Sequence, residues 1–563
     1  MDFMAKFLKE IATNRDVRED ALILIKANGR KEYYTWEDYI EMAIYMAKGL
    51  EKEGVKSGDR VAFIPLSLPE SFFALLGIML IGAIPVPINA PLVKEEGQVD
   101  LKKILADCQP KLLIIPACLE EYLTDIDDYA FNDETLAAGC EWYDGQKDYR
   151  HGIFLLNPTK IKLEVSGHLV DKIGTPWSEM DWPMLIMPYG WKYVPKETAD
   201  VLIMPYTSGT SGDPKGVMLS HENISAAVEA IGEELAVSDK DRILSYLSLG
   251  HISDLIATFF CHLRFGYKVY FTEHAREVVK DREKLRKNFP AVLRKVKPTV
   301  FLAVPKVWIN FKKQIETKFK LPMPRSWKHW LIKRALGFGE VRHYISAGAK
   351  IGINEKVFFA DMGIVIEDVY GQTEAAGAVT IDGKIIGKGW VGLDPKTGEI
   401  TVAGPNVMLG YWGRKEQPLS KFGNSNSYRT GDIGTQIGNR FNYVGKIGKG
   451  VKLAHGEFVT EAQIEQLEYT IRNIDPRIEE VVVCGDNKPY LVALVFIADL
   501  ARKLEVDETL YTTLALAIEQ AGEGIRKVGA IEILDSKQLE QTPTLKTRGE
   551  VVVKKFHDLI DRL

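Results

Sequence analysis

Cysteine is scarce in this sequence, which has five cysteines among 563 residues, at positions 108, 118, 140, 261 and 484. Their number is odd, their spacing is wide, and no two of them form a CxxC pair. Such a pattern is typical of reduced thiols and argues against both a disulfide framework and a zinc site. We therefore expect a cytoplasmic protein.

Long apolar runs are also missing. The nearest is Phe72–Pro87, whose 16 residues fall short of the roughly 20 that a membrane-spanning helix needs. Glycine or proline at positions 77, 82, 85 and 87 interrupts this run, so we expect a buried helix followed by a strand.

The first residues lack the apolar core of a signal peptide, because charged residues alternate through Met1–Asp16. Four apolar side chains share one helical face in this segment: Phe3, Phe7, Leu8 and Ile11. We expect this face to pack against the protein body. The alternative is that it makes a peripheral contact with the inner face of a membrane.

Neither sign of charge dominates, since 72 basic and 77 acidic residues give a formal net charge of −5. This balance argues against nucleic acid or a strongly anionic membrane as the main partner, so a charged ligand has to be bound by a local group of residues. Internal repeats and low-complexity tracts are absent. The length and a hydrophobic content of 46% predict a globular protein of roughly three to four structural units, with the oligomeric state left open.

Apolar runs alternate with segments of helical period along most of the chain, which predicts an α/β fold. We expect residues 1–443 to form a large N-terminal domain of helix-covered, mostly parallel sheets, with ligands bound beyond the strand ends. Residues 128–189 have no clean period and are interpreted as an insertion of unknown role. The expected helices are 36–53 and 69–81, and the expected strands include 60–65, 84–88, 111–116, 243–247, 268–271, 299–304, 343–346 and 364–368.

After Gly434 the sequence becomes rich in glycine and charge, through the segment GKIGKG at 445–450. We expect a hinge at 444–450, because glycine absorbs large changes in backbone dihedral angles at little cost. Residues 451–563 are then expected to form a small, mobile α+β domain. Its expected strands are 480–484, 490–497 and 529–534, and its expected helices are 460–473, 510–521 and 549–563.

The most informative segment is YTSGTSGDPKGV at 206–217, which combines hydroxyls, glycines and one lysine in a single loop. Glycine lets backbone N–H groups approach phosphate oxygens, and the hydroxyls donate further hydrogen bonds. Apolar residues at 201–204 and 217–219 predict a strand on each side, with a helix only from about His221. A Walker loop leads directly into a helix, so this anion site is of another kind. The alternative is an ordinary surface loop rich in glycine and serine.

Several later segments add polar groups in a fixed order. The segment IEDVYGQTE at 366–374 ends a strand in an aromatic, a glycine, a hydroxyl and a carboxylate, and YRTGD follows at 428–432. Others are LSLGHI at 247–252, SAGAK at 346–350, GEI at 398–400, GPNVMLGYW at 404–412 and TPTLKTR at 542–548. Together with the loop, these segments resemble the motifs of adenylate-forming enzymes, the superfamily of acyl-CoA synthetases, luciferases and peptide-synthetase adenylation domains. The resemblance covers roughly residues 36–556, with the insertion excepted.

The resemblance implies a binding site for ATP. In the family the loop holds the β- and γ-phosphates, which implies this role for Thr207, Ser208, Gly209, Thr210, Ser211, Gly212 and Lys215. The family's aromatic stacks on adenine and its threonine contacts the α-phosphate, and the matching residues are Tyr370, Gly371 and Thr373, with Gly348 lining the adenine and acyl pockets. Asp432 is implied as the acceptor for both ribose hydroxyls.

The resemblance also implies a catalytic set: Lys546, His251, Thr210 and Glu374. Glu374, together with Thr210, would hold Mg²⁺, because this hard cation prefers oxygen ligands. Lys546 would stabilise the charge that develops as an oxygen attacks the α-phosphate. His251 would help to place the substrate carboxylate, and the alternative is a structural histidine.

Three segments point to the long-chain fatty acyl-CoA synthetase branch: KPTVFLAVPK at 297–306, LAHGEFV at 453–459 and the TPTLK ending. The implied function is ATP-dependent activation of a medium- or long-chain fatty acid through acyl-AMP to acyl-CoA, with ATP, Mg²⁺ and coenzyme A as cofactors. In a second step the small domain would rotate and present Gly456, beside which the CoA thiol passes. GEI and GPNVMLGYW are interpreted as scaffold.

The hinge departs from the family pattern. Lys446 replaces a ribose-binding arginine, whose planar fork a point charge does not reproduce. Gly448 stands for a lysine, and Lys449 for the usual acidic residue. Two alternatives therefore stay open. One is an acyl-AMP ligase or a ligase for an acyl carrier protein, and the other is a non-catalytic nucleotide or acyl-CoA sensor on a synthetase fold. The chain length of the acid is also left open.

Overall fold

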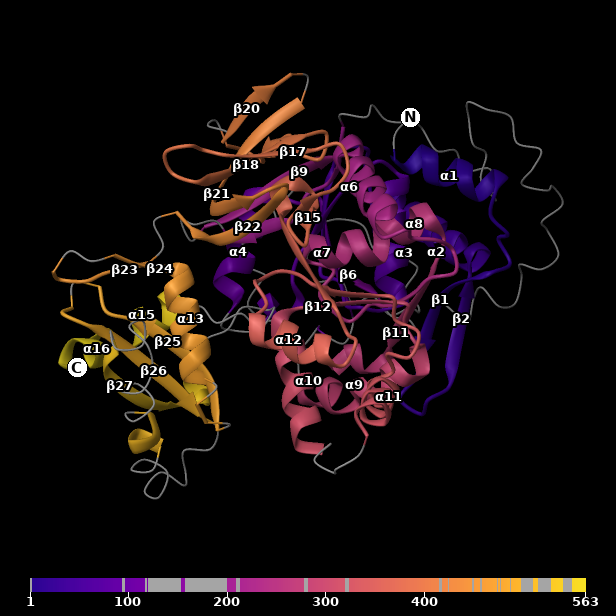
Figure 1. Cartoon of the computed structure of the whole chain (residues 1–563). Helices are drawn as coiled ribbons and strands as arrows, with labels where there is room; N and C mark the ends of the chain where they lie inside the picture. Colours follow the sequence, from indigo (N-terminus) through magenta and orange to yellow (C-terminus); the bar gives the residue numbers. More distant parts are fainter. Residues whose placement is uncertain are drawn as a thin grey trace. The chain divides into compact units, whose positions relative to one another are not determined.

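The computed structural model divides the chain into two compact units (Figure 1). Unit 1 comprises Met1–Gly392 and Thr401–Arg429, and unit 2 comprises Leu393–Ile400 and Thr430–Leu563. In the part that the structure describes, no helix is both long and apolar enough to cross a membrane. The described residues are 3–93, 97–116, 119, 153–156, 200–208, 213–277, 282–318, 324–414, 418–423, 425–447, 450–455, 458–472, 474–475, 477–486, 488–497, 510–514, 528–539 and 549–563.

Two sheets of unit 1 are formed mainly by parallel strands. The first is all parallel and has the order β4 (Ile84–Pro87), β3 (Arg60–Phe63), β5 (Leu112–Pro116) and β6 (Ile153–Leu156). The second is β10 (Arg242–Leu244), β11 (Lys268–Thr272), β1 (Asp20–Ile25) and β2 (Lys31–Thr35), where only β2 runs antiparallel. Helices in this part of the chain are α1 (Phe3–Thr13), α2 (Trp36–Lys52), α3 (Pro69–Leu80), the 3-10 helix Ala90–Val93, α4 (Gln98–Cys108), α6 (His221–Glu234), α7 (Ile252–Asp254), the π-helix Leu255–Phe260 and α8 (Cys261–Phe265).

The third sheet changes direction along its length. Its order is β12 (Val300–Ala303), β13 (His343–Ser346), β14 (Ile366–Gln372), β15 (Gly377–Ile381) and β16 (Lys384–Ile385). The first three strands are parallel. Beyond them, β14 pairs with β15 and β15 with β16 in antiparallel orientation. The helices of this region are the 3-10 helix Glu273–Glu277, α9 (Arg282–Val296), α10 (Pro305–Lys318), α11 (Arg325–Leu336), α12 (Ile353–Asp361) and the 3-10 helix Thr373–Ala375.

A fourth sheet in unit 1 has the order β19 (Gly410–Tyr411), β9 (Pro214–Ser220) and β7 (Val201–Ile203), and β8 (Tyr206–Ser208) also pairs with β9. The chain passes between the two units within strands β17 (Trp390–Leu393), β18 (Glu399–Gly404) and β21 (Ser425–Ile437). In unit 1, β20 (Leu419–Phe422) pairs with the first part of β21. In unit 2, β22 (Arg440–Lys446) pairs with the last part.

Local sequence explains why α2 and α3 form and meet. Thr35 caps α2, because its hydroxyl accepts from the Asp38 amide while the Asp38 carboxylate accepts from the Thr35 amide, which is a capping box. Pro69 opens α3, and every residue of this helix is buried. At Gly77 a Cβ would lie 2.6 Å from Met46 Cβ, so only glycine permits this approach of the two helices. The predicted buried helix followed by a strand in Phe72–Pro87 is confirmed.

The first helix packs against the body of unit 1, as expected. Phe3, Phe7, Leu8 and Ile11 are all at most 2% exposed. The ring of Phe3 contacts Phe260 edge-on at 5.4 Å between centroids. Because burial already accounts for this face, α1 does not supply the membrane contact named as the alternative.

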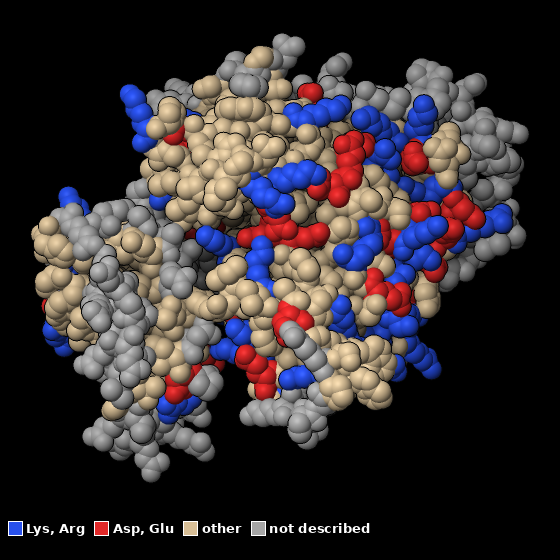
Figure 2. All heavy atoms as spheres, viewed as in Figure 1, with Lys and Arg blue, Asp and Glu red and all other residues tan. Residues whose placement is uncertain are grey.

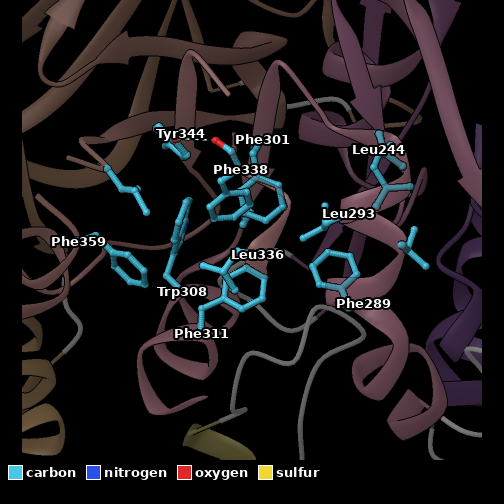
Figure 3. Close-up of a cluster of buried hydrophobic side chains, with 14 of the residues drawn as sticks. Leu244, Phe289, Leu293, Phe301, Trp308, Phe311, Leu336, Phe338, Tyr344 and Phe359 are labelled. Atoms are coloured by element: carbon cyan, nitrogen blue, oxygen red, sulfur yellow. Dashed lines mark hydrogen bonds between the residues drawn. The ribbon is translucent and has the colours of Figure 1, made fainter. Parts of the chain in front are cut away.

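An aromatic cluster fills the core around the third sheet (Figure 3). Phe301 of β12 lies against Trp308 of α10 at 5.2 Å and against Phe338 at 4.8 Å, measured between ring centroids. Phe289 of α9 and Leu336 of α11 belong to the same cluster. The helices α9, α10 and α11 therefore share one core and lie together at one end of unit 1 in Figure 1.

Unit 2 forms two cores, one on each face of a three-stranded sheet. The order is β25 (Ile478–Cys484), β26 (Leu491–Ile497) and β27 (Val528–Asp535). Alternate residues of β26 enter different cores, for example Val495 one and Phe496 the other, as the two-residue period of a strand requires. The other elements are β23 (Gly450–Lys452), β24 (Phe458–Thr460), α13 (Glu461–Arg472), the 3-10 helix Ser536–Gln538, α15 (Gly549–Lys555) and α16 (His557–Arg562).

Several expected helices and strands begin or end up to three residues away from their observed bounds, and three differences are larger. Residues 153–156 of the supposed insertion are strand β6, which pairs with β5 and extends the first sheet. The strand expected at 364–368 starts at Ile366 and continues to Gln372, because it pairs with β15 beyond its contact with β13. The final helix is two helices, separated at Phe556, whose ring packs against Phe496. Most of the helix expected at 510–521 lies outside the described residues.

Candidate functional site

The loop that is expected to bind phosphate connects two antiparallel strands. Thr207 of β8 pairs with Lys215 of β9, and Ser208 pairs with Pro214. The next helix, α6, begins only at His221, where Ser220 caps it in a capping box with Asn223. The expected order of strand, loop and strand is confirmed, and this arrangement differs from a Walker loop. Gly209, Thr210, Ser211 and Gly212 lie outside the described residues.

The hydroxyl of Thr207 suits a phosphate ligand. Its oxygen is buried and has no hydrogen-bond partner in the described structure. Buried hydroxyls are nearly always paired in folded proteins, so an unpaired one at an anion loop fits a donor to a bound oxygen. This observation supports the role that the sequence gives to the loop.

A helix that sequence analysis did not connect with the site holds this hairpin in place. Tyr206 donates from its hydroxyl to Asp107 of α4 at 2.6 Å. On the other side of the loop, Lys103 of α4 lies 2.7 Å from the Asp213 carboxylate. Arg414 lies 3.7 Å from Asp107. Helix α4 therefore anchors both ends of the loop, and no motif in the sequence marks its residues.

The segment GPNVMLGYW contacts the same hairpin from its other edge. Gly410 pairs with Met218, and the Trp412 amide donates to the Gly216 carbonyl at 2.8 Å. A Cβ at Gly216 would lie 2.9 Å from the ring of Tyr206, so a larger residue at this position would displace that ring. The segment thus supports the hairpin, which agrees with its interpretation as scaffold.

One residue of that segment, Tyr411, also enters the site. The Lys215 ammonium lies 5.3 Å from the centroid of the Tyr411 ring. The Tyr411 hydroxyl donates to the Glu374 carboxylate at 2.9 Å and lies 3.4 Å from the hydroxyl of Tyr428. Burial, together with the nearby Glu374 charge, raises the pKa of Tyr411 above its usual range. Tyr411 therefore contacts Lys215 through its ring and Glu374 through its hydroxyl. Sequence analysis missed this link.

Glu374 sits in the 3-10 helix Thr373–Ala375 directly after β14. Its side chain is buried, at 8% exposure, and its carbonyl accepts from the Met408 amide at 2.9 Å. Tyr370 and Gly371 precede it on β14, at a bulge in the pairing with β15. Any side chain at Gly371 would collide with the Gly377 carbonyl, so this backbone approach requires glycine. Tyr370, Gly371, Thr373 and Glu374 thus lie on one short segment.

The protein oxygen ligands at this site would fit a magnesium ion that is bound mainly through the phosphate oxygens of a nucleotide. Among the described residues, no group of three or more His, Cys, Asp or Glu side chains gathers around a common point. Mg²⁺ needs few protein ligands when a nucleotide supplies the rest, and one or two carboxylates are common. Glu374 offers a carboxylate held in orientation by Tyr411. The other residue expected at the metal, Thr210, lies outside the described structure.

Gly348 follows the end of β13. Its φ is +84°, a left-handed conformation that favours glycine, and a Cβ there would meet only Val304 at 3.8 Å. Gly348 is exposed, while nearby Ser346 is buried and its hydroxyl has no hydrogen-bond partner in the described structure. The backbone here has room for a ligand beside it.

His251 precedes α7, and its Nε2 atom is buried without a hydrogen-bond partner in the described structure. Burial lowers the pKa of His251 to about 4, so the ring is neutral at pH 7. A neutral imidazole can still donate one hydrogen bond to a carboxylate oxygen. Three residues later, Asp254 is also buried, and burial raises the pKa of Asp254 to about 7. Asp254 was not among the expected site residues.

In unit 2 the structure brings Asp432 and Lys446 together. The two residues pair across β21 and β22, and the Lys446 ammonium lies 3.7 Å from the Asp432 carboxylate. Asp432 is buried, and its amide donates to the Thr430 hydroxyl at 3.1 Å. Glu399 accepts from the amide of Gly431, which has a φ of +72°. This constellation offers a carboxylate and a cation within a short distance of each other.

Some expected residues are not placed by the structure. Gly456 and Lys546 lie outside the described residues, as do Gly448 and Lys449 of the expected hinge. Their roles stay predictions.

Comparison with known sequences agrees with this geometry. The profile described as "AMP-binding enzyme" matches residues 11–412, and "AMP-binding enzyme C-terminal domain" matches residues 451–563. The mouse protein named long-chain-fatty-acid–CoA ligase ACSBG2 is 24% identical, over 94% of this chain and 81% of its own length. A Mycobacterium tuberculosis protein named putative fatty-acid–CoA ligase fadD11 is 30% identical, over 55% of this chain and 60% of its own length.

Solved structures show the same fold. A structure of McyG A-PCP complexed with phenylalanyl-adenylate aligns over 99% of this chain and 83% of that one, with a TM-score of 0.75 and 15% identity. A structure from a study of fatty acyl-adenylate ligases from E. coli and L. pneumophila aligns over 100% of this chain and 99% of that one, with a TM-score of 0.73 and 16% identity. The fold, the order of the motifs and the profile match lead to one conclusion: the chain belongs to the AMP-binding enzyme family.

Proposed function

We propose that this protein is a fatty acid–CoA ligase that activates a medium- or long-chain fatty acid with ATP, through acyl-AMP, to acyl-CoA. One observation carries the proposal. Tyr411 joins the lysine of the phosphate loop to a buried carboxylate, with the Lys215 ammonium 5.3 Å from its ring centroid and Glu374 2.9 Å from its hydroxyl. A cation and a metal-type carboxylate close to an anion loop suit a bound triphosphate.

On the nucleotide side, each residue has a distinct task. Lys215 and the Thr207 hydroxyl would hold the β- and γ-phosphates, joined by the loop residues 209–212. Glu374 would hold Mg²⁺, which neutralises phosphate charge when bound. Tyr370 would stack on adenine, and Gly371 and Gly348 would let backbone lie close to the nucleotide. Asp432 would accept from the ribose hydroxyls, with Lys446 beside it at 3.7 Å.

On the acyl side, His251 is suited to orient a carboxylate without competing for its charge. Its lowered pKa keeps the ring neutral, so it can donate a hydrogen bond and does not form a tight ion pair with the nucleophile. The relatives named as long-chain-fatty-acid or fatty-acid CoA ligases support a fatty acid as the substrate. Asp254, which is protonated for much of the range below pH 7, adds no fixed negative charge there.

The proposed reaction has two steps. A carboxylate oxygen first attacks the α-phosphorus, a new P–O bond forms, and the bond to pyrophosphate breaks. Lys546 would stabilise the charge on the phosphoryl oxygens during this step. The CoA thiol then attacks the acyl carbon and AMP leaves, after residues 451–563 rotate about the hinge at 444–450 and present Gly456. The reaction would take place in the cytoplasm.

The test is a set of pyrophosphate-release assays with Mg²⁺, ATP and saturated acids of graded length, each with and without CoA. Each methylene buried in an apolar tunnel adds about 0.8 kcal/mol of binding, so activity is expected to rise from acetate towards longer chains. Acyl-CoA formation supports the full proposal. Pyrophosphate release with acyl-AMP but no acyl-CoA would instead support an acyl-AMP ligase or a carrier-protein ligase. No turnover with any acid, combined with nucleotide binding, would support the sensor.

A matched pair of variants ties the activity to the site. Lys215→Ala removes the loop cation and is expected to lower pyrophosphate release strongly. Lys56→Ala removes an exposed lysine of unit 1 that lies in a turn before β3, and its activity is expected to equal that of the unsubstituted protein. Equal activity of both variants would show that Lys215 does not hold the phosphates.

A further inference from the structure

The chain carries a strongly basic segment that the proposed reaction does not use. Between residues 282 and 336 the sequence has sixteen Lys and Arg residues and only two Glu. The chain as a whole has a formal net charge of −5, so this concentration of positive charge is local. The segment spans α9, α10 and α11, which share one aromatic core and lie together at one end of unit 1 (Figure 1).

Helix α11 presents large aromatic side chains to solvent at this end. Trp327 is 69% exposed and Trp330 is 57% exposed. They stand three residues apart, and Arg334 follows four residues later, so the three side chains lie on one helical face. The Arg334 guanidinium lies 5.2 Å from the centroid of the Trp330 ring. Ile332 and Leu336, on the other face, are buried in the core.

The surrounding charges support a positive potential at this end. Arg294 of α9 donates to the Ala335 carbonyl of α11 at 2.7 Å, which joins the C-terminal ends of the two helices. The pKa of Lys31 is lowered, first by burial and then by repulsion from Lys297, Arg242 and Lys295; Glu340 forms ion pairs with Lys297 and Arg242, while Lys295 is exposed. In Figure 2, Lys and Arg atoms border a tan area where Figure 1 places these helices.

We propose that α11, with the exposed Arg294 and Lys295 at the end of α9, docks unit 1 onto a membrane surface that contains anionic lipid. Tryptophan is favoured at the boundary between water and lipid, because one part of its ring system is apolar and its N–H is polar. Lysine and arginine near an anionic membrane each contribute about 1 kcal/mol. The exposed tryptophans and the basic helices together meet both requirements.

A second copy of the chain fits this surface less well. A twofold contact through α11 would place two strongly cationic surfaces against each other, which costs electrostatic energy. Two exposed tryptophans also provide much less apolar area than the roughly 1,200 Å² that stable protein interfaces bury at minimum. An anionic bilayer, by contrast, complements the charge and accepts both rings. This docking does not depend on the ligase reaction.

The experiment measures binding of the full-length protein to vesicles of phosphatidylcholine, with and without phosphatidylglycerol, by co-sedimentation. We expect binding to the anionic vesicles that high salt reverses, since screening shortens the range of charge interactions to about 3 Å at 1 M salt. The double variant Trp327→Ala and Trp330→Ala is expected to weaken binding at least about tenfold, because two rings no longer insert into the lipid. Lys328→Gln with Arg334→Gln is expected to weaken it about 30-fold, from the loss of two charges.

Matched controls separate docking from general effects. Trp390→Ala removes another exposed tryptophan of unit 1, and Lys56→Gln with Lys388→Gln removes two exposed lysines elsewhere on it; both are expected to bind as the unsubstituted protein does. Trp327→Phe with Trp330→Phe keeps apolar rings and is expected to retain most of the binding. Thermal unfolding verifies that each variant is folded.

The proposal is overturned by either of two results. One is that the tryptophan and charge variants bind anionic vesicles as tightly as their controls do. The other is that these variants change the oligomeric state in sedimentation without vesicles, which would assign the surface to a second copy of the chain. Because the readout is vesicle binding, a protein that lacks ligase activity can still confirm or overturn it.

Discussion

Replacing Tyr411 by phenylalanine tests the centre of the proposed site. The change removes one hydroxyl and keeps the ring, so it leaves no cavity and keeps the contact between the ring and Lys215. It removes the hydrogen bond of 2.9 Å to the Glu374 carboxylate. Both residues are 8% exposed, so water cannot easily replace the lost donor.

The magnitude follows from the chemistry of this hydrogen bond. A hydrogen bond to a charged group contributes about 1.5 to 3 kcal/mol, and its loss leaves a buried acceptor unsatisfied. The fall in Tm is this loss of free energy divided by the entropy of unfolding, which is about 2.1 cal/mol/K per residue. For the roughly 420 residues of unit 1, Tm therefore falls by about 2 to 3 °C. Groups that orient a metal ligand typically affect metal affinity or activity by about 10- to 100-fold.

The assay is a Mg²⁺ titration of pyrophosphate release together with thermal unfolding. We expect Tyr411→Phe to raise the Mg²⁺ concentration for half-maximal activity about tenfold or more, with little change in the KM for the fatty acid. Tyr428→Phe is a graded control, because its hydroxyl lies 3.4 Å from that of Tyr411. Tyr33→Phe is a neutral control, because Tyr33 is 52% exposed. Identical titrations for Tyr411→Phe and Tyr33→Phe would refute the role given to Tyr411.

Four further predictions concern single residues. Glu374→Gln is expected to raise the Mg²⁺ requirement and slow pyrophosphate release, because an amide is a poor ligand for a hard dication; unchanged magnesium dependence would show that Glu374 is not the metal carboxylate. Lys546→Ala is expected to lower adenylation by about two to three decades, or about 3 to 4 kcal/mol, yet to leave thioester formation from supplied acyl-AMP intact; equal loss of both half-reactions would exclude the two-position mechanism. Asp254 has a pKa of about 7 when folded, so the folded state binds more protons than the unfolded state between about pH 4 and 7, and stability is lost as pH rises through this window. The stability of Asp254→Asn relative to the unsubstituted protein should therefore rise from pH 5 to pH 8 by about 2 to 3 kcal/mol, seen as a growing difference in Tm, and a constant difference across this range would contradict it. Gly371→Ala is expected to destabilise unit 1 by several kcal/mol, measured by thermal unfolding, because its Cβ would collide with the Gly377 carbonyl.

Much of the fold was predictable because it depends on local patterns. Strand β13 spans His343–Ser346 as expected, and α2 starts at Trp36, where the capping residue Thr35 is visible in the sequence. The hairpin of the anion loop was predictable for the same reason, since apolar runs flank it on both sides. Strand β6 was missed because only four apolar residues stand within a long stretch without a period.

The site was predictable where a motif places several residues side by side in the chain. Tyr370, Gly371, Thr373 and Glu374 lie within five positions, so one strand end holds all of them. Asp107 and Lys103 could not be found in this way, because ordinary helical residues carry no sign that they anchor a loop about one hundred positions later. Their contact depends on how α4 packs beside β9, which is a tertiary property.

Tyr411 shows why scaffold and chemistry are difficult to separate in a sequence. The segment around it forms a strand that pairs with β9, and this pairing alone would justify the interpretation as scaffold. The same pairing, however, fixes the Tyr411 side chain close to the loop cation and within hydrogen-bond distance of Glu374. A shift of one residue along β19 would turn the Tyr411 side chain to the opposite face of the sheet. The backbone that supports the two functional groups therefore also has to hold the residue that connects them. The strand register of β19 on β9 is therefore itself part of what orients Glu374, the proposed metal carboxylate.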